Sequence, residues 1–413
     1  MPIGLYVDKD VKRLKSTYDS WMELMYSAEE SIEIGAMYWS LLARNTDSRK
    51  EFPWDPSCQE GTNVYNKLKE VAKSGVKIRI AQDGTRNTYP ESDELVREGL
   101  AEVRSLNFTI LENYGILHSK FWIVDGKHLY IGSANHDWRS LTQVKEMGVL
   151  VKNCPCLASD LGNIFETYWK VGIPNAKVPE VWSSEYTSKY NSENPISTKI
   201  SDDNSLVYLT TSPPSFAPAG REHDGLTIIN NINNAKKYIY ISVMDYSPST
   251  FYRNNENVYW PDIDDALRSA AYGRRVHVRL LVSKWQSTRK EVLLHLKSLQ
   301  DINSILPCVY DRVQKKCVQE KGSVEVKIFE VPKYNVTIPY GRVNHAKYMV
   351  SDYTATMCTS NWSADYFLNS AGVSFVVQDE DAAKEATLVK DLREIFERDW
   401  NSEYATELDK VLS

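Results

Sequence analysis

The feature that most constrains this chain is a short motif that occurs twice. Its first copy has the pattern H-x-K-x4-D, with His118, Lys120 and Asp125, and Asn135 follows shortly after. The alternation of residues predicts two strands joined by a tight turn at the Asp-Gly pair. Because alternate residues of a strand face the same side, His118 and Lys120 are predicted to project from one face.

The second copy repeats this spacing near the other end of the chain. It places His345, Lys347 and Asp352 in the same pattern, and Asn361 closes it. One copy alone would be a weak signal, but chance is a poor explanation for two, since unpaired lysines are rarely buried. A nucleophilic nitrogen beside a fixed cation suits attack on a phosphate.

The two motifs lie within a wider repeat. The sequence AEESIEIGAMYWS at 28–40 is echoed by AKKYIYISVMDYS at 235–247, and DLGNIFETYW by DLREIFERDW. Strands alternating with helices predict a duplicated α/β unit with mixed sheets covered by helices on both faces. We predict a first unit at 1–173, a linker or loop at 174–214 and a second unit at 215–413, with a complete site only where the units meet.

The residues around both motifs resemble the phospholipase D superfamily. The stretches GSANHDWRSLTQVKEMGV and IPYGRVNHAKYMVSD are similar to the lysosomal branch of phospholipase-D-like proteins, known as 5′ exonucleases on single-stranded DNA and RNA, and to their poxviral relatives. The resemblance runs from about Ser31 to Tyr404. It implies two phospholipase-D-like α-β-α units related by a pseudo-two-fold axis, and cleavage of phosphodiesters through a phosphohistidine.

The resemblance also implies the order of the chemical roles. His118 is expected to be the nucleophile, and His345 the general acid and then the general base. Imidazoles titrate near neutral pH and suit both tasks. Four further side chains are expected to hold the non-bridging phosphate oxygens, namely Lys120, Lys347, Asn135 and Asn361. Because four such donors can replace a metal ion, we predict that neither a metal nor a cofactor is needed.

Three acidic residues complete the predicted catalytic set. Asp125 and Asp352 belong to the motifs, although their position at the end of a strand favours a structural role. Glu146 is predicted to hold the second nitrogen of one histidine, and the alternative is a solvated charge at a strand edge. The matching position in the second half is Gly372, so the halves are not equivalent there.

Aromatic residues suggest where a single strand would bind. The chain has 25 tyrosines and 11 tryptophans, and bases of single strands stack on exposed rings. For each ring taken alone, core packing is the competing explanation. The residues predicted to bind substrate are Tyr38, Trp39, Tyr246, Trp285 and Tyr340, of which we take Tyr38 and Tyr246 to occupy corresponding positions.

Three functions remain open at this stage. The first is a 5′ exonuclease that releases 3′-phosphomononucleotides. The second is hydrolysis or headgroup exchange on phospholipids, and the third is a scaffold without activity, which the two intact motifs disfavour. The net charge of −6 argues against a protein that tracks duplex DNA by bulk charge.

Cysteines and targeting signals give weaker information. Of six cysteines, Cys308 and Cys317 are the best pair for a disulfide, and a zinc site is disfavoured because no histidine has ligand spacing near them. By resemblance, Cys154 and Cys156 would bond to cysteines upstream that this chain lacks. Cys358 stands where the family usually has glycine, and Lys284 where the lysosomal branch commonly has cysteine.

No segment has the length and apolar character of a membrane span or a signal peptide. The resemblance implies a lysosomal or endosomal lumen, or secretion, with membrane attachment only through an upstream anchor. Two sequons begin at Asn107 and Asn335 and matter only in a secretory compartment. A homodimer remains open, although the chemistry does not require one.

Overall fold

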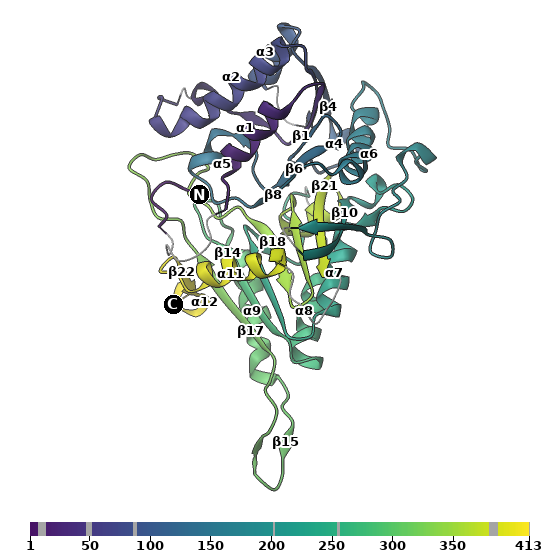
Figure 1. Cartoon of the computed structure of the whole chain (residues 1–413). Coiled ribbons are helices and arrows are strands. Elements are labelled where there is room, and N and C mark those ends of the chain that lie inside the picture. The colour runs from purple at the N-terminus through teal and green to yellow at the C-terminus, as the bar shows by residue number, and fades with distance from the viewer. Residues whose placement is uncertain are drawn as a thin grey trace.

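The computed structural model describes residues 1–6, 14–46, 52–85, 89–200, 203–253, 257–379 and 387–412. Two α/β units lie one above the other, and each contributes one sheet (Figure 1). Helix α1 begins at Thr17 and ends at Ser27, with Ser16 as its cap. The sequence predicts this helix from Val11, but residues 11–13 lie outside the described part of the chain.

The sheet of the first unit is mixed. Within the described residues it has six strands, in the order β4 (Glu102–Leu106), β3 (Lys77–Asp83), β1 (Ser31–Ala36), β5 (Phe121–Val124), β6 (His128–Gly132) and β8 (Gly148–Val151). Strands β4, β3 and β1 run parallel, whereas β5, β6 and β8 join by antiparallel pairing.

The sheet of the second unit repeats this order strand by strand. It runs β17 (Ser323–Phe329), β14 (His277–Ser283), β12 (Tyr238–Val243), β18 (Lys347–Ser351), β19 (Thr354–Cys358) and β21 (Gly372–Asp379). Further strands extend it at the edges, namely β22 (Ala405–Glu407) beside β17, and β10 (Asp203–Ser212) and β11 (Glu222–His223) beside β21. The prediction of a duplicated α/β unit with mixed sheets is therefore confirmed.

The segment 174–214 differs from the expected linker or loop. It contains β9 (Ile196–Ile200) and β10, and β10 pairs with β21 from Ser205 to Ser212. The strand is rich in serine and threonine, which resembles loop composition. These hydroxyls are nevertheless buried, and Thr210, for example, donates to Asp224. A buried polar side chain with a partner is compatible with a strand.

Helices cover both faces of each sheet. On the outer faces, α1 and α2 (Gln59–Lys73) pack on the first sheet, and α7 (Asp224–Asn234), α8 (Asp262–Gly273) and α9 (Lys290–Gln300) pack on the second. The largest apolar cluster contains α6 (Pro155–Val171), α11 (Thr387–Trp400) and residues of both sheets. One continuous core therefore joins the two units.

Short elements complete the fold. They are α3 (Pro90–Arg97), α4 (Phe108–Leu111), α5 (Trp138–Thr142), α10 (Ala364–Leu368), α12 (Leu408–Leu412), β2 (Trp39–Ser40), β7 (His136–Asp137), β13 (Tyr246–Ser247), β20 (Trp362–Ser363), β15 (Tyr310–Asp311) and β16 (Lys316–Cys317). Among the described residues, no helix is both long enough and apolar enough to cross a membrane.

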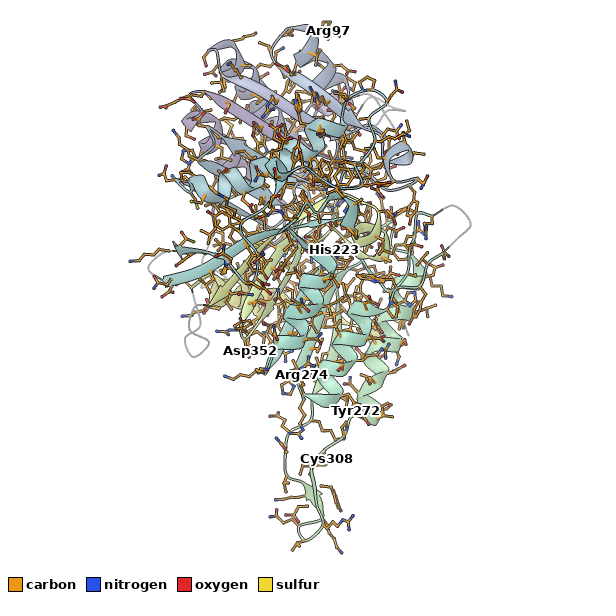
Figure 2. The ribbon with its side chains drawn as sticks, turned by 90° about the vertical axis from the view of Figure 1, so that its right-hand side faces the viewer. Arg97, His223, Tyr272, Arg274, Cys308 and Asp352 are labelled. Carbon is orange, nitrogen blue, oxygen red and sulfur yellow. A yellow bond between two sulfur atoms is a disulfide. The ribbon has the colours of Figure 1, made fainter. Side chains whose placement is uncertain are left out.

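Strands β15 and β16 form a hairpin that projects away from the second unit (Figure 1). A disulfide joins Cys308 to Cys317 across the hairpin, and Figure 2 marks Cys308 at its base. This pairing confirms the one predicted. A two-stranded hairpin alone is marginally stable, so the covalent link accounts for its order. The other cysteines, Cys58, Cys154, Cys156 and Cys358, are free thiols in the described structure.

Candidate active site

Backbone hydrogen bonds bring the two motif histidines to the boundary between the units. The amide of His118 donates to the carbonyl oxygen of Ala371 at 2.8 Å, and the amide of His345 donates to that of Lys145, also at 2.8 Å. Ala371 immediately precedes β21 and Lys145 precedes Glu146 near β8, so the contacts are equivalent under the internal repeat. Each histidine is thus held in place by the other half of the chain.

The motif lysines lie beside the histidines in the same arrangement twice. The Nζ of Lys120 donates to the carbonyl oxygen of His118 at 2.5 Å, and the Nζ of Lys347 donates to that of His345 at 2.6 Å. Both lysines are buried. Burial holds the pKa of Lys120 well below its ordinary value, and the charge of Lys347 lowers it further.

Burial also lowers the pKa of Lys347 to about 7, although Glu146 and Asp245 oppose this effect. Two buried ammonium groups whose charges disfavour each other are costly, and the nearby carboxylates offset this cost only in part. An anion bound between them would restore their charge, so this arrangement suits a phosphate.

The histidines share one electrostatic environment. Burial lowers the pKa of His118 well below its usual 6.5, and the charges of Lys120, Lys347 and His345 lower it further. All of these groups therefore act across a single site. Burial also lowers the pKa of His345, but the carboxylate of Glu146 raises it. Of the two imidazoles, His345 is the one equipped to hold a proton.

Glu146 explains this difference. Its Oε2 lies 2.9 Å from Nδ1 of His345 and accepts a hydrogen bond from Ser133 Oγ at 2.5 Å. Its side chain is only 3% exposed, so the alternative of a solvated edge charge is wrong. Burial raises the pKa of Glu146, but His345 and Lys347 bring it below the ordinary value. The predicted contact with a histidine is confirmed, and that histidine belongs to the other half.

The equivalent position in the second half cannot carry such a carboxylate. A Cβ added to Gly372 would lie 2.0 Å from Ser360 Oγ and 2.8 Å from Ser212 Oγ. Consequently, no described residue offers His118 a carboxylate partner. Instead, the ring of Tyr366 packs edge-on against His118 with the centroids 4.6 Å apart.

The two motif asparagines complete the inner surface. Asn135 and Asn361 are buried, and Nδ2 of Asn135 lies 3.4 Å from the hydroxyl of Tyr38. The Oδ1 of each asparagine has no hydrogen-bond partner among the described residues. Since a buried acceptor without a donor is costly, each Oδ1 is available to a donor on a bound ligand.

The motif aspartates lie at the far ends of their strands, where their contacts agree with the structural role that the sequence favours for them. The carboxylate of Asp125 accepts hydrogen bonds from the amides of Glu29, Glu30 and Ser31 at 2.8–3.0 Å. Asp352 accepts from the equivalent amides before β12, those of residues 236–238. Figure 2 shows Asp352 on the second unit, well away from the boundary between the units. Both aspartates fasten the start of a central strand.

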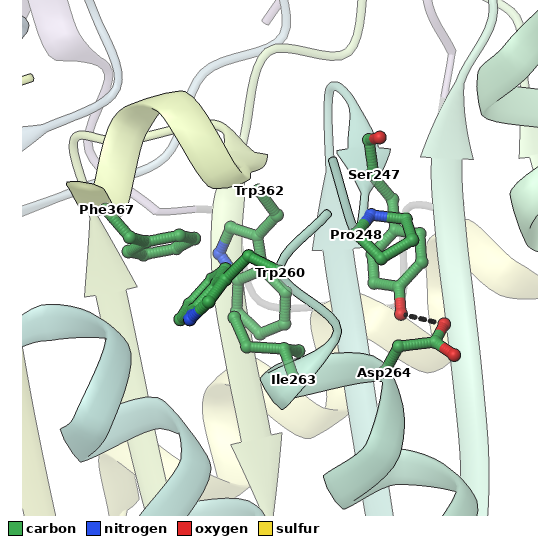
Figure 3. Close-up of a pocket in the computed structure, with 8 residues that line it drawn as sticks. Ser247, Pro248, Trp260, Ile263, Asp264, Trp362 and Phe367 are labelled. Carbon is green, nitrogen blue, oxygen red and sulfur yellow. Dashed lines mark hydrogen bonds between the residues drawn. The ribbon is translucent and has the colours of Figure 1, made fainter. Parts of the chain in front are cut away.

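Two predicted substrate-binding aromatics belong to the core. Trp39 and Tyr246 are 3% and 2% exposed, so neither ring offers a face to a base. They occupy equivalent two-residue strands, β2 and β13. The hydroxyl of Tyr246 donates to Asp264 beside a small pocket (Figure 3). The pocket is lined by Tyr246, Ser247, Pro248, Trp260, Ile263, Asp264, Trp362 and Phe367, and none of these is a motif residue.

The other three aromatics remain candidates to different degrees. Tyr38 is half-buried, and its hydroxyl donates to Asp137 at 2.8 Å. Trp285 is half-buried, whereas Tyr340 is 59% exposed, with the guanidinium of Arg139 5.9 Å from its ring centroid. Because Trp39 matches Tyr246, the true counterpart of Tyr38 is Asp245, which corrects the correspondence expected from the sequence.

The sequence analysis did not predict Asp245, Tyr252 or Tyr366 as residues of the site. Asp245 acts electrostatically on Lys347, and Tyr252 packs edge-on against Tyr366 with the centroids 6.2 Å apart. Tyr252 is 45% exposed, and the guanidinium of Arg289 lies 5.2 Å from its ring centroid. A residue-by-residue alignment of the two repeats would have drawn attention to Asp245.

Comparisons with known proteins agree with this geometry. The family model "PLD3/4, PLD-like domain" matches residues 10–321. The "5'-3' exonuclease PLD3" of Xenopus laevis is 41% identical over 417 residues, which cover 100% of this chain and 80% of the relative. The "Probable phospholipase D F09G2.8" of Caenorhabditis elegans is 44% identical, with 99% and 69% covered.

Among solved structures, phosphatidylserine synthase of Haemophilus influenzae superposes with a TM-score of 0.60 at 12% identity, covering 94% of this chain and 85% of that one. This likeness extends to the fold alone. Together, the doubled motif, the paired sheets and the full-length relatives show that the chain belongs to the PLD3/4 family of phospholipase-D-like proteins.

Proposed function

We propose that this protein is a metal-independent 5′→3′ exonuclease that removes 3′-phosphomononucleotides from single-stranded DNA or RNA through a phosphohistidine. The observation that carries the proposal is the pair of His-Lys motifs held together across the boundary between the units by reciprocal backbone hydrogen bonds. Relatives named 5'-3' exonuclease, which align with nearly the whole chain, support the choice of substrate.

In the first step, neutral His118 attacks the phosphorus between the first and second nucleotides. The bond from phosphorus to the 5′ oxygen of the second nucleotide breaks, and that oxygen takes a proton from His345. This leaves the first nucleotide bound to His118 through its 3′ phosphate. In the second step, His345 accepts a proton from water, the water oxygen attacks the phosphorus, and the bond to His118 breaks.

The assignment of the two histidines rests on their different surroundings. The low pKa of His118 keeps its imidazole neutral, as a nucleophile requires. Glu146 raises the pKa of His345 and fixes its Nδ1, so that its other nitrogen can deliver a proton. Lys120, Lys347 and the two motif asparagines would stabilise the charge that gathers on the non-bridging oxygens.

An oligonucleotide assay tests this proposal. Single-stranded DNA and RNA with a 5′ hydroxyl are incubated with the protein in EDTA, and the products are separated by mass. We expect mononucleotides with a 3′ phosphate from the wild-type protein and none from His118→Ala. Products that carry a 5′ phosphate, or activity that EDTA abolishes, would contradict the mechanism.

Phospholipid chemistry is the second candidate, because one relative that aligns with 99% of this chain is named a probable phospholipase D. The same phosphohistidine can form on a lipid, with an alcohol in place of water in the second step. Vesicles of phosphatidylglycerol form a parallel arm of the assay. Processed lipid together with intact oligonucleotides would favour this candidate over the first.

The compartment forms part of the proposal. The disulfide between Cys308 and Cys317 requires an oxidising environment, and such bonds are rare in the cytosol. A lysosomal or endosomal lumen, or secretion, satisfies this requirement and agrees with the resemblance. We propose that the chain divides into units at 1–173 and 215–413, with β9 and β10 of the intervening segment added to the edge of the second sheet. The proposed chemistry does not require a homodimer, because both histidines come from one chain.

A further inference from the structure

Asp245 lies near two residues of the second motif, Lys347 and Asn361. Two positions earlier, Val243 pairs with Lys347 in the sheet, and the next residue, Tyr246, pairs with Trp362 directly after Asn361. The backbone therefore places Asp245 at the end of β12, between the motif lysine and the motif asparagine. Its carboxylate interacts electrostatically with Lys347 and Arg289.

Asp245 is connected to His118 through Tyr366. Asp245 also acts on the hydroxyls of Tyr252 and Tyr366. Tyr366 in turn packs against the ring of His118 at 4.6 Å between centroids. Asp245 thus belongs to the wall of the site on the side of the second unit, where Tyr252 presents an exposed ring.

The carboxylate of Asp245 lacks a donor. No described residue donates a hydrogen bond to it, although it is half-buried and burial raises its pKa to about 6. The contrast with Glu146 is informative, because Glu146 receives two hydrogen bonds. A partly buried acceptor without a donor is costly unless a ligand supplies one.

The equivalent residue in the first unit has a different character. Tyr38 occupies the corresponding position, and its hydroxyl is engaged with Asp137. Above the pKa of Asp245, the site therefore presents an anionic acceptor on one side of the phosphate and a phenol that already donates to Asp137 on the other. A second phosphate on the substrate would be repelled on the side of Asp245, whereas a hydroxyl would be bound there.

We propose that Asp245 recognises the free 5′ hydroxyl of the terminal nucleotide and excludes strands that end in a 5′ phosphate. This inference rests on the proposed exonuclease function, because a 5′ end must reach the site for Asp245 to read it. The hydroxyl donates to the carboxylate, and a terminal phosphate brings like charge to the same place. Tyr252 offers its ring to the base of that nucleotide.

The test compares three oligonucleotides of one sequence that end in 5′ hydroxyl, 5′ phosphate or 5′-deoxy sugar. For the wild-type protein we expect kcat/KM to be about 10–100-fold higher for the hydroxyl than for the 5′-deoxy end, as for a hydrogen bond to a charged group. The 5′ phosphate should be cleaved more slowly still.

Asp245→Asn keeps an acceptor but removes the charge, so it should narrow the gap between hydroxyl and phosphate and largely keep that between hydroxyl and 5′-deoxy. Asp245→Ala should bring both ratios close to one. Asp352→Asn is the matched control, because this motif carboxylate binds backbone amides at the far end of β12, and it should leave both ratios unchanged.

Turnover of bis(p-nitrophenyl) phosphate, which has no 5′ end, separates end recognition from a general effect on Lys347. Any change in this turnover in the Asp245 variants measures the effect on Lys347, and it should scale all three oligonucleotides equally, whereas end recognition changes the ratios between them. The variants should melt near the wild-type temperature. If Asp245→Ala does not fold, the ratios of Asp245→Asn decide the question.

Two results would overturn the inference. Variants of Asp245 that keep both wild-type ratios overturn the inference alone, because the exonuclease activity remains. Wild-type protein that cleaves none of the three oligonucleotides overturns the proposed function and the inference with it.

Discussion

The two halves of the chain agree in the groups that hold a phosphate and differ in the groups that govern protons. Both have the same strand order, the same hydrogen bond from lysine to the histidine carbonyl and the same aspartate fastening the central strand. They differ at one equivalent position, which is Glu146 in the first half and Gly372 in the second. A phosphate presents similar oxygens to both sides, but one histidine must attack while the other donates a proton. Both halves can therefore keep the same phosphate-binding groups after duplication. The groups that govern protons must differ between the halves for catalysis.

The largest expected effect separates the two histidines. His118→Ala and His345→Ala should each reduce oligonucleotide cleavage by about 10⁴-fold, because each removes an essential group. They should differ on thymidine 3′-(p-nitrophenyl phosphate), whose leaving group departs without a proton. A stopped-flow trace should show a burst of p-nitrophenol equal to the enzyme concentration for His345→Ala and none for His118→Ala. The reverse pattern would exchange the assigned roles.

The next effect concerns the carboxylate present in only one half. Glu146→Gln should lower kcat by about 10–100-fold, as for other partners that orient a catalytic histidine. The carboxylate raises the pKa of His345, so its loss lowers that pKa. The general acid then loses its proton at a lower pH, and the alkaline limb of the pH profile should shift to lower pH.

Ser133→Ala removes one hydrogen bond to Glu146 but leaves the charge beside His345, so its alkaline limb should stay closer to that of the wild type than the limb of Glu146→Gln does. An unchanged alkaline limb in Glu146→Gln would mean that this limb does not report His345.

A third prediction concerns the glycine that replaces the carboxylate. Gly372→Ala should destabilise the protein by about 1–3 kcal/mol, because the new methyl group meets Ser360 Oγ at 2.0 Å. Gly162→Ala is a suitable control, since nothing lies within 4 Å of its Cβ and it occupies helix α6. The control should be neutral or stabilising in urea unfolding. Equal stability of both variants would show that the second half could have accommodated a side chain there.

The smallest effect concerns the motif aspartates, which the halves share. Asp125→Asn and Asp352→Asn should each cost about 1 kcal/mol in the free energy of unfolding and leave kcat within a few-fold. Burial raises the pKa of Asp125, but the amides of Ser31, Glu30 and Glu29 bring it below its ordinary value. Its contribution to stability is therefore present above the unfolded pKa, near ~3.9, and lost as the pH falls through the folded pKa.

Unfolding curves of wild type and Asp125→Asn should converge in acid. A large loss of kcat at unchanged stability would return these aspartates to the catalytic set.

Much of the site was predictable because duplication leaves a mark in the sequence. The repeated spacing identified His118, His345 and their lysines, and the positions of the strands followed from alternation. The sequence predicts that Glu146 contacts a histidine, but it does not show which of the two. That depends on how the units face each other, because Glu146 crosses the boundary to reach His345.

Other features escaped prediction for physical reasons. Residue type alone does not show that the rings of Trp39 and Tyr246 are buried. Their burial depends on the pairing of β2 with β7 and of β13 with β20. Strand β10 was missed because its serines and threonines resemble loop composition, whereas their burial depends on the pairing of β10 with β21 and on partners such as Asp224. Asp245 was not predicted because matching Tyr246 to Tyr38 by residue type hides the equivalence of Asp245 and Tyr38. The missing donor to its carboxylate is visible only in the surrounding structure.

The reciprocal bonds from His118 to Ala371 and from His345 to Lys145 have a mechanical consequence. Any hinge motion that widened the boundary between the units would pull both imidazoles off the reacting phosphate together. We therefore expect turnover to occur while the two units stay joined, with the substrate entering and leaving without their separation.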